Sequence, residues 1–194
     1  MTFLLTPYAV AQFVAAAMSA AVSVIAWRRR TVPGGHPFTF MMWAVVVWTL
    51  MSAFESGSVG LRWKLLFSQL AYVGTVNVAP LFLLFVLRYR DRALRLRPVL
   101  VAALFVLPLA TLALAFTNPL HGLVWPTIEL DAVTGTNVAI YGHGIAYWVS
   151  LAYYLALCLA GAVILVRAVL RSPGLYRSQT TVLLIAVAVP WTGA

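Results

Sequence analysis

The feature that most constrains this chain is the recurrence of apolar stretches about as long as a bilayer is thick. Six such stretches lie at about 8–27, 38–54, 65–87, 98–116, 142–170 and 179–194, and they are apolar on all sides rather than in alternation. A spanning helix needs about 20 apolar residues, whereas a barrel strand has about ten residues of alternating polarity. Since a span in lipid must pair its own backbone groups, we predict an all-α, polytopic membrane helix bundle.

Composition excludes an ordinary soluble domain. The chain has 194 residues, of which 63% are hydrophobic and 9% are charged, against about 45–50% and about 25% in typical globular proteins. The mean hydropathy is +0.98. A net charge of +9 can indicate nucleic-acid binding, but the arginines lie beside apolar spans. We therefore expect anionic lipid headgroups as partners at the arginine-rich loops, and no nucleic acid.

The distribution of basic residues predicts how the chain crosses the membrane. No charged residue precedes the first span, and Arg28-Arg29-Arg30 follow it directly. With this orientation, eleven of the 13 basic residues fall on the cytoplasmic side, and Arg62 and Lys64 fall outside. Because cytoplasmic loops are enriched in Lys and Arg, we predict an outside N-terminus, an outer loop at 117–141, and a place in the bacterial inner or plasma membrane.

Residues 1–194 are predicted to form a single transmembrane domain. The last span, 179–194, has 16 residues, fewer than the roughly 17–25 that cross a bilayer. We therefore expect six of seven helices here, with a continuation that completes the sixth span and adds a seventh. The single Cys158 excludes a disulfide within the chain and is expected to be a buried spacer.

Polar and aromatic side chains within the spans are the candidate ligand-binding residues. Glu55 is either a ligand-contacting or proton-sensing group or a member of an ion pair with Arg62 or Lys64, because a carboxylate near lipid must be paired or wet. Polar groups in spans turn inward, so they either line a pocket or bond helices together. The residues we expect to line a pocket are Trp48, Glu55, Tyr72, Asn77, Trp125 and Tyr147.

Catalytic and metal chemistry is not expected. His121, His143, Glu129 and Asp131 match no tight metal-ligand spacing, and no Gly-rich phosphate loop or Cys pair occurs. We expect no cofactor and no enzyme activity in this region. The alternative to a metal site is that the outer loop folds over the bundle, with Trp125 anchored at the interface.

A series of motifs resembles the N-terminal seven-helix sensor region of membrane histidine kinases. It covers nearly the whole chain, and the order of the motifs is more specific than any one of them. The series comprises Trp48–Glu55, Lys64–Gly74, Pro80, the outer-loop residues Thr117-Asn118, His121 and Trp125, and the run Tyr141-Gly142-His143-Gly144. It ends where the chain enters its sixth span, at Tyr176-Arg177 and Gln179, followed by Pro190.

The resemblance implies a sensor that detects an extracellular or membrane-dissolved small ligand and signals to a cytoplasmic output domain. In that family the output is often a histidine kinase, sometimes a diguanylate cyclase, and the kinases usually act as homodimers. Arg177 and Gln179 would lie where the bundle joins the output domain. The alternative function is a small transporter or channel, which would require ionisable groups at mid-membrane. A retinal photoreceptor would need a buried lysine, and Lys64 lies at the outer edge.

Overall fold

The computed structural model describes residues 2–91, 94, 96–130 and 138–171. In chain order its elements are α1 (Pro7–Arg28), α2 (Gly35–Gly57), α3 (Leu61–Arg90), α4 (Pro98–Phe116), α5 (Asn118–His121), β1 (Ile128–Leu130), β2 (Ala139–Tyr141) and α6 (Ile145–Arg171). Five of these helices are long and apolar enough to cross a membrane. The prediction of an all-α membrane bundle is confirmed, and the predicted sixth span lies outside the described residues.

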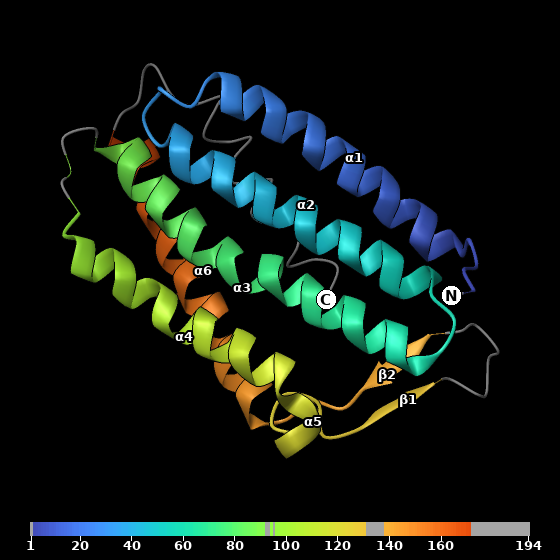
Figure 1. Ribbon diagram of the computed structural model, residues 1–194. Helices are drawn as coiled ribbons and strands as arrows, with labels where there is room; N and C mark the ends of the chain where they lie inside the picture. Colours follow the sequence, from blue (N-terminus) through green and yellow to red (C-terminus); the bar gives the residue numbers. More distant parts are fainter. Residues whose placement is uncertain (1, 92–93, 95, 131–137, 172–194) are drawn as a thin grey trace.

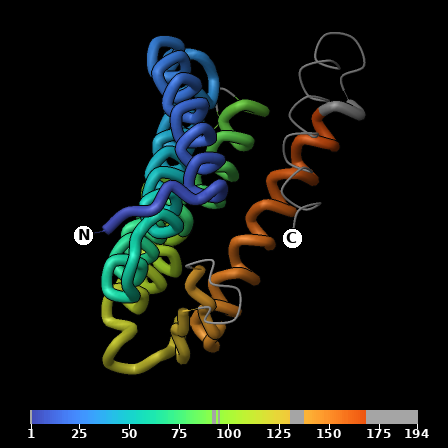
Figure 2. Tube along the Cα trace, turned by 90° about the vertical axis from the view of Figure 1, so that its right-hand side faces the viewer, coloured from blue at the N-terminus to red at the C-terminus, as the bar shows by residue number. Residues whose placement is uncertain are grey.

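Helices α1 to α4 form one layer, and α6 packs on one face of it (Figures 1 and 2). The longest helix, α3, is central because it packs against α2, α4 and α6. It also holds more buried residues than any other span, whereas large hydrophobic residues of α1 and α4 such as Met18, Val99 and Val106 are exposed. Exposed apolar side chains on spans of this length are what lipid contact requires.

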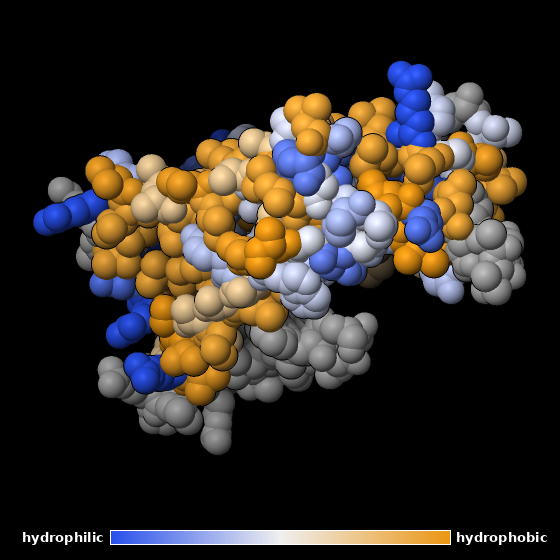
Figure 3. Space-filling view, turned by 90° about the horizontal axis from the view of Figure 1, so that it is seen from below, coloured by the Kyte–Doolittle hydropathy of each residue, from blue (hydrophilic) through white to orange (hydrophobic). Residues whose placement is uncertain are grey.

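The two ends of the bundle differ in chemistry. One end, which we call the arginine end, collects Arg28, Arg88, Arg90, Arg97 and Arg167. Figure 3 shows hydrophilic residues at its left edge beside a mostly hydrophobic face. The opposite end, which we call the sheet end, carries α5 and an antiparallel pair of strands in which Ile128 faces Tyr141. The sequence predicted an outer loop at 117–141 here, and it did not predict α5 or the short sheet.

Three helices begin three or more residues from the predicted positions, and one of them is α2, which begins at Gly35 rather than 38. Helix α3 begins at Leu61 rather than near 65, so Arg62 and Lys64 belong to the helix. This is tolerated because the Lys64 ammonium donates to the Glu55 carbonyl oxygen at 3.0 Å. Helix α6 begins at Ile145 rather than 142, because the N–H groups of Gly142 and Gly144 bond the carbonyls of Thr127 and Val124 instead of starting a helix.

Helices α2 and α3 cross with their backbones in close approach at Gly74. A Cβ atom there would lie 2.2 Å from the Ala44 carbonyl oxygen and 2.6 Å from the Trp48 nitrogen. Small residues at such crossings allow the close packing that holds membrane helices together. The Gly74 position therefore fixes the spacing of two of the helices that form the cavity described below.

Replacing Gly74 with alanine is expected to destabilise the protein, although Gly→Ala inside a helix normally stabilises by about 1 kcal/mol. The added methyl group meets backbone atoms, so the helices must separate, at a cost typical of overpacking, about 1–3 kcal/mol. Unfolding in mixed detergent micelles measures the change. A gain in stability at this position would show that the helices are not packed as described.

Candidate functional site

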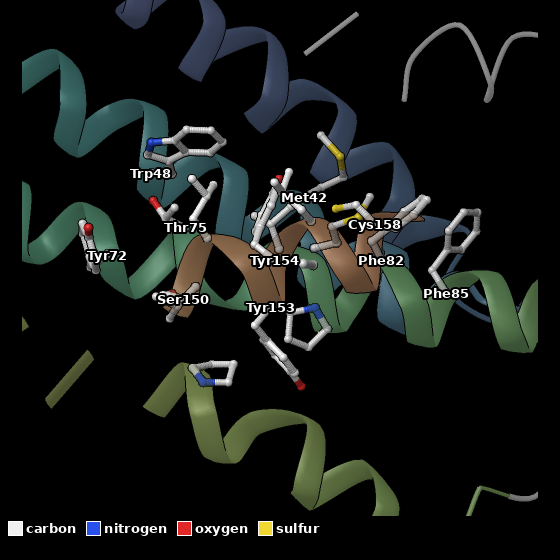
Figure 4. Close-up of a pocket in the computed structure, with 18 of the residues that line it drawn as sticks. Met42, Trp48, Tyr72, Thr75, Phe82, Phe85, Ser150, Tyr153, Tyr154 and Cys158 are labelled. Carbon is white, nitrogen blue, oxygen red and sulfur yellow. The ribbon is translucent and has the colours of Figure 1, made fainter. Parts of the chain in front are cut away.

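A cavity of about 710 Å³ lies between α2, α3, α4 and α6 (Figure 4). Its volume falls in the range of about 300–1,000 Å³ that is typical of small-molecule sites. Helix α3 forms the floor, and α2 and α6 form the two walls. The lining residues are Phe38, Met41, Met42, Trp48, Tyr72, Thr75, Val76, Val78, Ala79, Pro80, Phe82, Phe85, Pro108, Tyr147, Ser150, Leu151, Tyr153, Tyr154, Leu155 and Cys158.

The side chains of α3 explain why space remains here. Thr75, Val76 and Ala79 are small and occupy the middle of the floor, between the larger rings of Tyr72 and Phe82. Towards the arginine end, α6 closes onto α3 where Leu165, fully buried, packs against Phe82 and Phe85. The floor also contains Pro80, a residue that cannot donate a helical hydrogen bond and can bend a helix.

Several polar side chains of the cavity lie at one end of it, and Tyr154 lies nearer its middle. Figure 4 shows Trp48, Tyr72, Thr75 and Ser150 together at the end nearer the sheet, whereas Met42, Cys158, Phe82 and Phe85 lie towards the other. The Thr75 hydroxyl donates to its own helix, at the Ala71 carbonyl oxygen. We call these two parts the polar half and the apolar half of the cavity.

A cluster of buried residues closes the bundle between the cavity and the sheet. Ala115 and Val124 are fully buried, Trp125 is 5% exposed, and Tyr72 and Tyr147 pack against them. We call Ala115, Val124 and Trp125 the plug. Because Tyr72 and Tyr147 also line the cavity, the plug forms its boundary at the sheet end.

Asn118 holds the plug in place. Its side-chain oxygen accepts the N–H groups of Val124 and Trp125 at 3.0 Å each, and its amide donates to the Trp125 carbonyl oxygen at 2.9 Å. Gly144 fits beneath the same turn, where a Cβ atom would lie 2.2 Å from the Leu123 carbonyl oxygen. The Asn118 and Tyr-Gly-His-Gly motifs are therefore the two parts of one fold over the bundle, as the second interpretation of the outer loop predicts, but Trp125 is buried in the plug rather than anchored at the membrane interface.

A chain of aromatic contacts connects the plug to the polar groups outside it. The Trp125 ring lies 5.0 Å from that of Tyr72, in an edge-on arrangement, and 5.4 Å from that of Tyr141, centroid to centroid. The Tyr141 hydroxyl donates to the Glu55 carboxylate at 3.2 Å and lies 2.6 Å from the Ser68 hydroxyl. Burial, and then the negative charge of Glu55, raise the pKa of Tyr141, so its hydroxyl stays protonated and can donate.

Lys64 is the cation that accompanies Glu55. Its side chain is fully buried, its ammonium donates to the Glu55 backbone carbonyl, and its charge acts on the Glu55 carboxylate. Of the two partners expected for Glu55, the structure places Lys64 beside it, whereas Arg62 is exposed.

The structure places the predicted ligand-binding residues in three groups. Trp48, Tyr72 and Tyr147 line the cavity. Trp125 belongs to the plug, and Glu55 lies beyond it, bonded to Tyr141. Asn77 is not among the lining residues, and its amide donates to the Val73 carbonyl oxygen of its own helix at 2.8 Å. The predicted coupling residues Arg177 and Gln179 lie outside the described residues.

Several lining residues were not expected from the sequence. Thr75 and Ser150 supply hydroxyl groups, Met41 and Met42 supply flexible apolar surface, and Cys158 faces the cavity rather than acting as a spacer. Helical spacing could have indicated Ser150 and Cys158, since positions 147, 150, 151, 154 and 158 recur at intervals of three and four and so share one face of α6.

Within the described residues, no group of three or more His, Cys, Asp or Glu side chains could hold a metal ion. His121 is engaged in its own turn, where its Nδ1 accepts the Leu123 N–H at 3.0 Å. The His143 ring lies tilted against that of Tyr147, at 4.0 Å between centroids. Both histidines therefore serve local structure at the sheet end.

Comparison with known proteins gives one result. No curated protein and no solved structure matches the chain. The family model described as the N-terminal 7TM region of histidine kinase matches residues 11–194, which include most of α1, the other four described spans, the plug and every residue that lines the cavity. The chain belongs to the N-terminal seven-transmembrane region of histidine kinases.

Proposed function

We propose that this region senses a small ligand, which binds in the cavity and biases the arrangement of the helices that drive a cytoplasmic kinase domain. The region is a multi-pass membrane module, and membership of the family implies the kinase output. The observation that supports ligand sensing is the cavity itself, of about 710 Å³, which has a polar half and an apolar half.

A ligand in this position would touch helices that need not move together. It would contact α2 and α3, which are locked by the Gly74 crossing, and α6, which packs on α3 and α4. A ligand shifts an equilibrium only if it binds one arrangement better than the other. We propose that occupancy changes the position of α6 against α3, and that α6 passes this change towards the arginine end, which we propose faces the cytoplasm.

The arrangement of charges favours a sensor over an ion-coupled transporter, the alternative function. Transporters place ionisable groups near mid-membrane. In the described spans, Glu55 lies two residues before the end of α2, and Lys64 is the fourth residue of α3. Both belong to the polar cluster beyond the plug, so neither charge reaches the cavity.

The experiment compares two tryptophan substitutions on α6 in the full-length kinase in membranes. Ser150→Trp fills the polar half of the cavity, whereas Leu159→Trp adds the same ring at a position that is 60% exposed on the outer surface of α6. Coupling between sites is typically worth 5–150-fold, so Ser150→Trp is expected to shift the autophosphorylation rate at least about fivefold. Leu159→Trp is expected to leave it close to wild type.

A second cavity-filling variant, Leu155→Trp, separates a filled cavity from a local fault at Ser150. Both fillers should shift the rate in the same direction while the proteins keep a cooperative unfolding transition. Equal rates in wild type, both fillers and the surface variant would contradict the proposal. Uptake of a solute by liposomes containing the protein would instead favour the transporter.

A further inference from the structure

We infer that Tyr153 is the positioning residue that ties α6 to α4 beside the cavity, by supplying a hydrogen-bond donor that Pro108 lacks, and that movement of α6 reaches the kinase only while this tie holds. The inference rests on the proposed function and assigns the control of that site to one bond between two helices. It is carried by three observations: a proline inside α4, a tyrosine of α6 bonded to the carbonyl that this proline leaves unpaired, and the packing of three helices around that bond.

The proline of α4 interrupts the hydrogen bonds of its own helix. Pro108 lies inside α4 and has no backbone N–H, so the carbonyl oxygen four residues earlier, that of Leu104, has lost its usual helical donor. In a membrane span such an oxygen needs another partner, because hydrocarbon offers none. The interruption therefore creates an acceptor that a neighbouring helix can use.

Tyr153 of α6 is the partner of this acceptor. Its hydroxyl donates to the Leu104 carbonyl oxygen at 2.9 Å, a distance typical of a well-formed hydrogen bond. Figure 4 shows the Tyr153 ring pointing from α6 towards α4, whereas Tyr154, the next residue, points the other way. The Tyr154 hydroxyl interacts with Cys158, one turn further along its own helix. Of these two neighbouring tyrosines, Tyr153 is therefore the one that joins α6 to α4.

The bond lies where three helices meet. Leu104 and Tyr153 pack against one buried cluster, which spans α3 and α6 and consists of Ala79, Leu83 and Leu157. The proline of α3, Pro80, follows directly on this cluster and lines the cavity together with Pro108. Since proline can bend a helix, the bond fixes α6 at the level where both of its neighbours can bend.

The place of Tyr153 within α6 explains what the tie does. Towards the sheet end, Tyr147 and Ser150 line the cavity, so a ligand there touches this part of α6. Towards the arginine end, Leu165 is fully buried against α3. A ligand that displaces the first part of α6 acts on a helix held at Tyr153, so the displacement turns the helix about this point and reaches the second part. Without the tie, the displacement is taken up between α6 and α4.

The first experiment tests the bond by unfolding the membrane region of the full-length kinase in mixed detergent micelles. Tyr153→Phe removes only the hydroxyl, and we expect it to raise the unfolding equilibrium constant at least about fivefold, the equivalent of one net hydrogen bond. Pro108→Ala restores an N–H group to α4, so in that background Tyr153→Phe should raise the constant less than about twofold. Tyr154→Phe is the matched control and should have the same effect in both backgrounds.

The second experiment tests the role in signalling, with the full-length kinase in membranes. Ser150→Trp is expected to shift the autophosphorylation rate at least about fivefold in the otherwise wild-type protein. With Tyr153→Phe, or with Tyr153→Phe and Pro108→Ala together, the same filler should shift the rate less than about twofold. The double variant is informative because it recovers the stability without restoring the tie. A residue with a purely structural role would regain the response together with the stability.

Three results would overturn the inference. Equal costs of Tyr153→Phe in the two backgrounds would show that the hydroxyl does not replace the missing N–H group. A full response to the filler in Tyr153→Phe would show that the kinase does not need the tie. Recovery of the response in the double variant would show that Tyr153 only supports the fold. If the filler changes the rate in no background, the sensor proposal fails and the signalling role falls with it, while the unfolding experiment still decides the bond.

Discussion

Replacing Asn118 with alanine is expected to lower the free energy of unfolding by about 3–4 kcal/mol. The side chain is 4% exposed and makes three hydrogen bonds to the backbone of Val124 and Trp125. Each bond is worth about 1 kcal/mol net, and a buried backbone group left without a partner costs about 1–3 kcal/mol. The loss therefore exceeds that of an ordinary surface substitution, which is within about 0.5 kcal/mol.

Asn77→Ala is the matched control for this prediction. Among the residues that the structure describes, the Asn77 amide donates only to the Val73 carbonyl oxygen of its own helix, so we expect a change below about 1 kcal/mol. Unfolding in mixed detergent micelles gives both values. Equal losses at Asn118 and Asn77 would mean that Asn118 does not hold the plug.

Replacing Lys64 with methionine is expected to cost about 2–4 kcal/mol, because the Glu55 carbonyl oxygen loses a charged donor, worth about 1.5–3 kcal/mol, and the Glu55 carboxylate loses the positive charge that acts on it. The Lys64 side chain is fully buried, and its ammonium bonds the Glu55 carbonyl oxygen at 3.0 Å. Methionine is similar in length but offers neither the hydrogen bond nor the charge. The Glu55 carboxylate would keep its hydrogen bond from the Tyr141 hydroxyl but lose the positive charge that acts on it.

Two further variants separate charge from packing at Lys64. Arg62→Met removes an exposed positive charge two residues away and should change stability by less than about 0.5 kcal/mol. Adding Glu55→Gln to Lys64→Met removes the uncompensated carboxylate and should recover part of the loss, as a double-mutant cycle would measure. No recovery would mean that Lys64 acts through packing alone.

The sequence was sufficient to predict the described helices and their approximate limits. Bilayer-length apolar runs allow few other folds, and helix α4 ends where the run from Pro98 to Phe116 does. The clustering of Arg28, Arg88 and Arg97 at one end of the bundle follows from the same pattern. These features depend on residues that are close together in the sequence, so the sequence alone predicts them.

The site depended on contacts between residues far apart in the chain. The sequence suggested Tyr72 and Tyr147 as candidates, but that they meet the plug through Trp125 depends on the packing of α3, α4 and α6. Asn77 was also suggested by the sequence, but it does not line the cavity, and its side-chain amide donates to the Val73 carbonyl oxygen of its own helix. Ser150 was missed because a single hydroxyl in an apolar span stands out only when its helical spacing from Tyr147 and Tyr154 is considered.

The measurement that tests the central claim most directly is kinase autophosphorylation after the cavity has been filled covalently. N-pyrenylmaleimide attached to Cys158 places an apolar ring system in the cavity, whereas the same adduct on Leu159→Cys, in the Cys158→Ser background, lies in the lipid. In the full-length kinase we expect the Cys158 adduct alone to change the rate at least about fivefold. Equal rates for the two adducts would contradict control of the kinase by occupancy of this cavity.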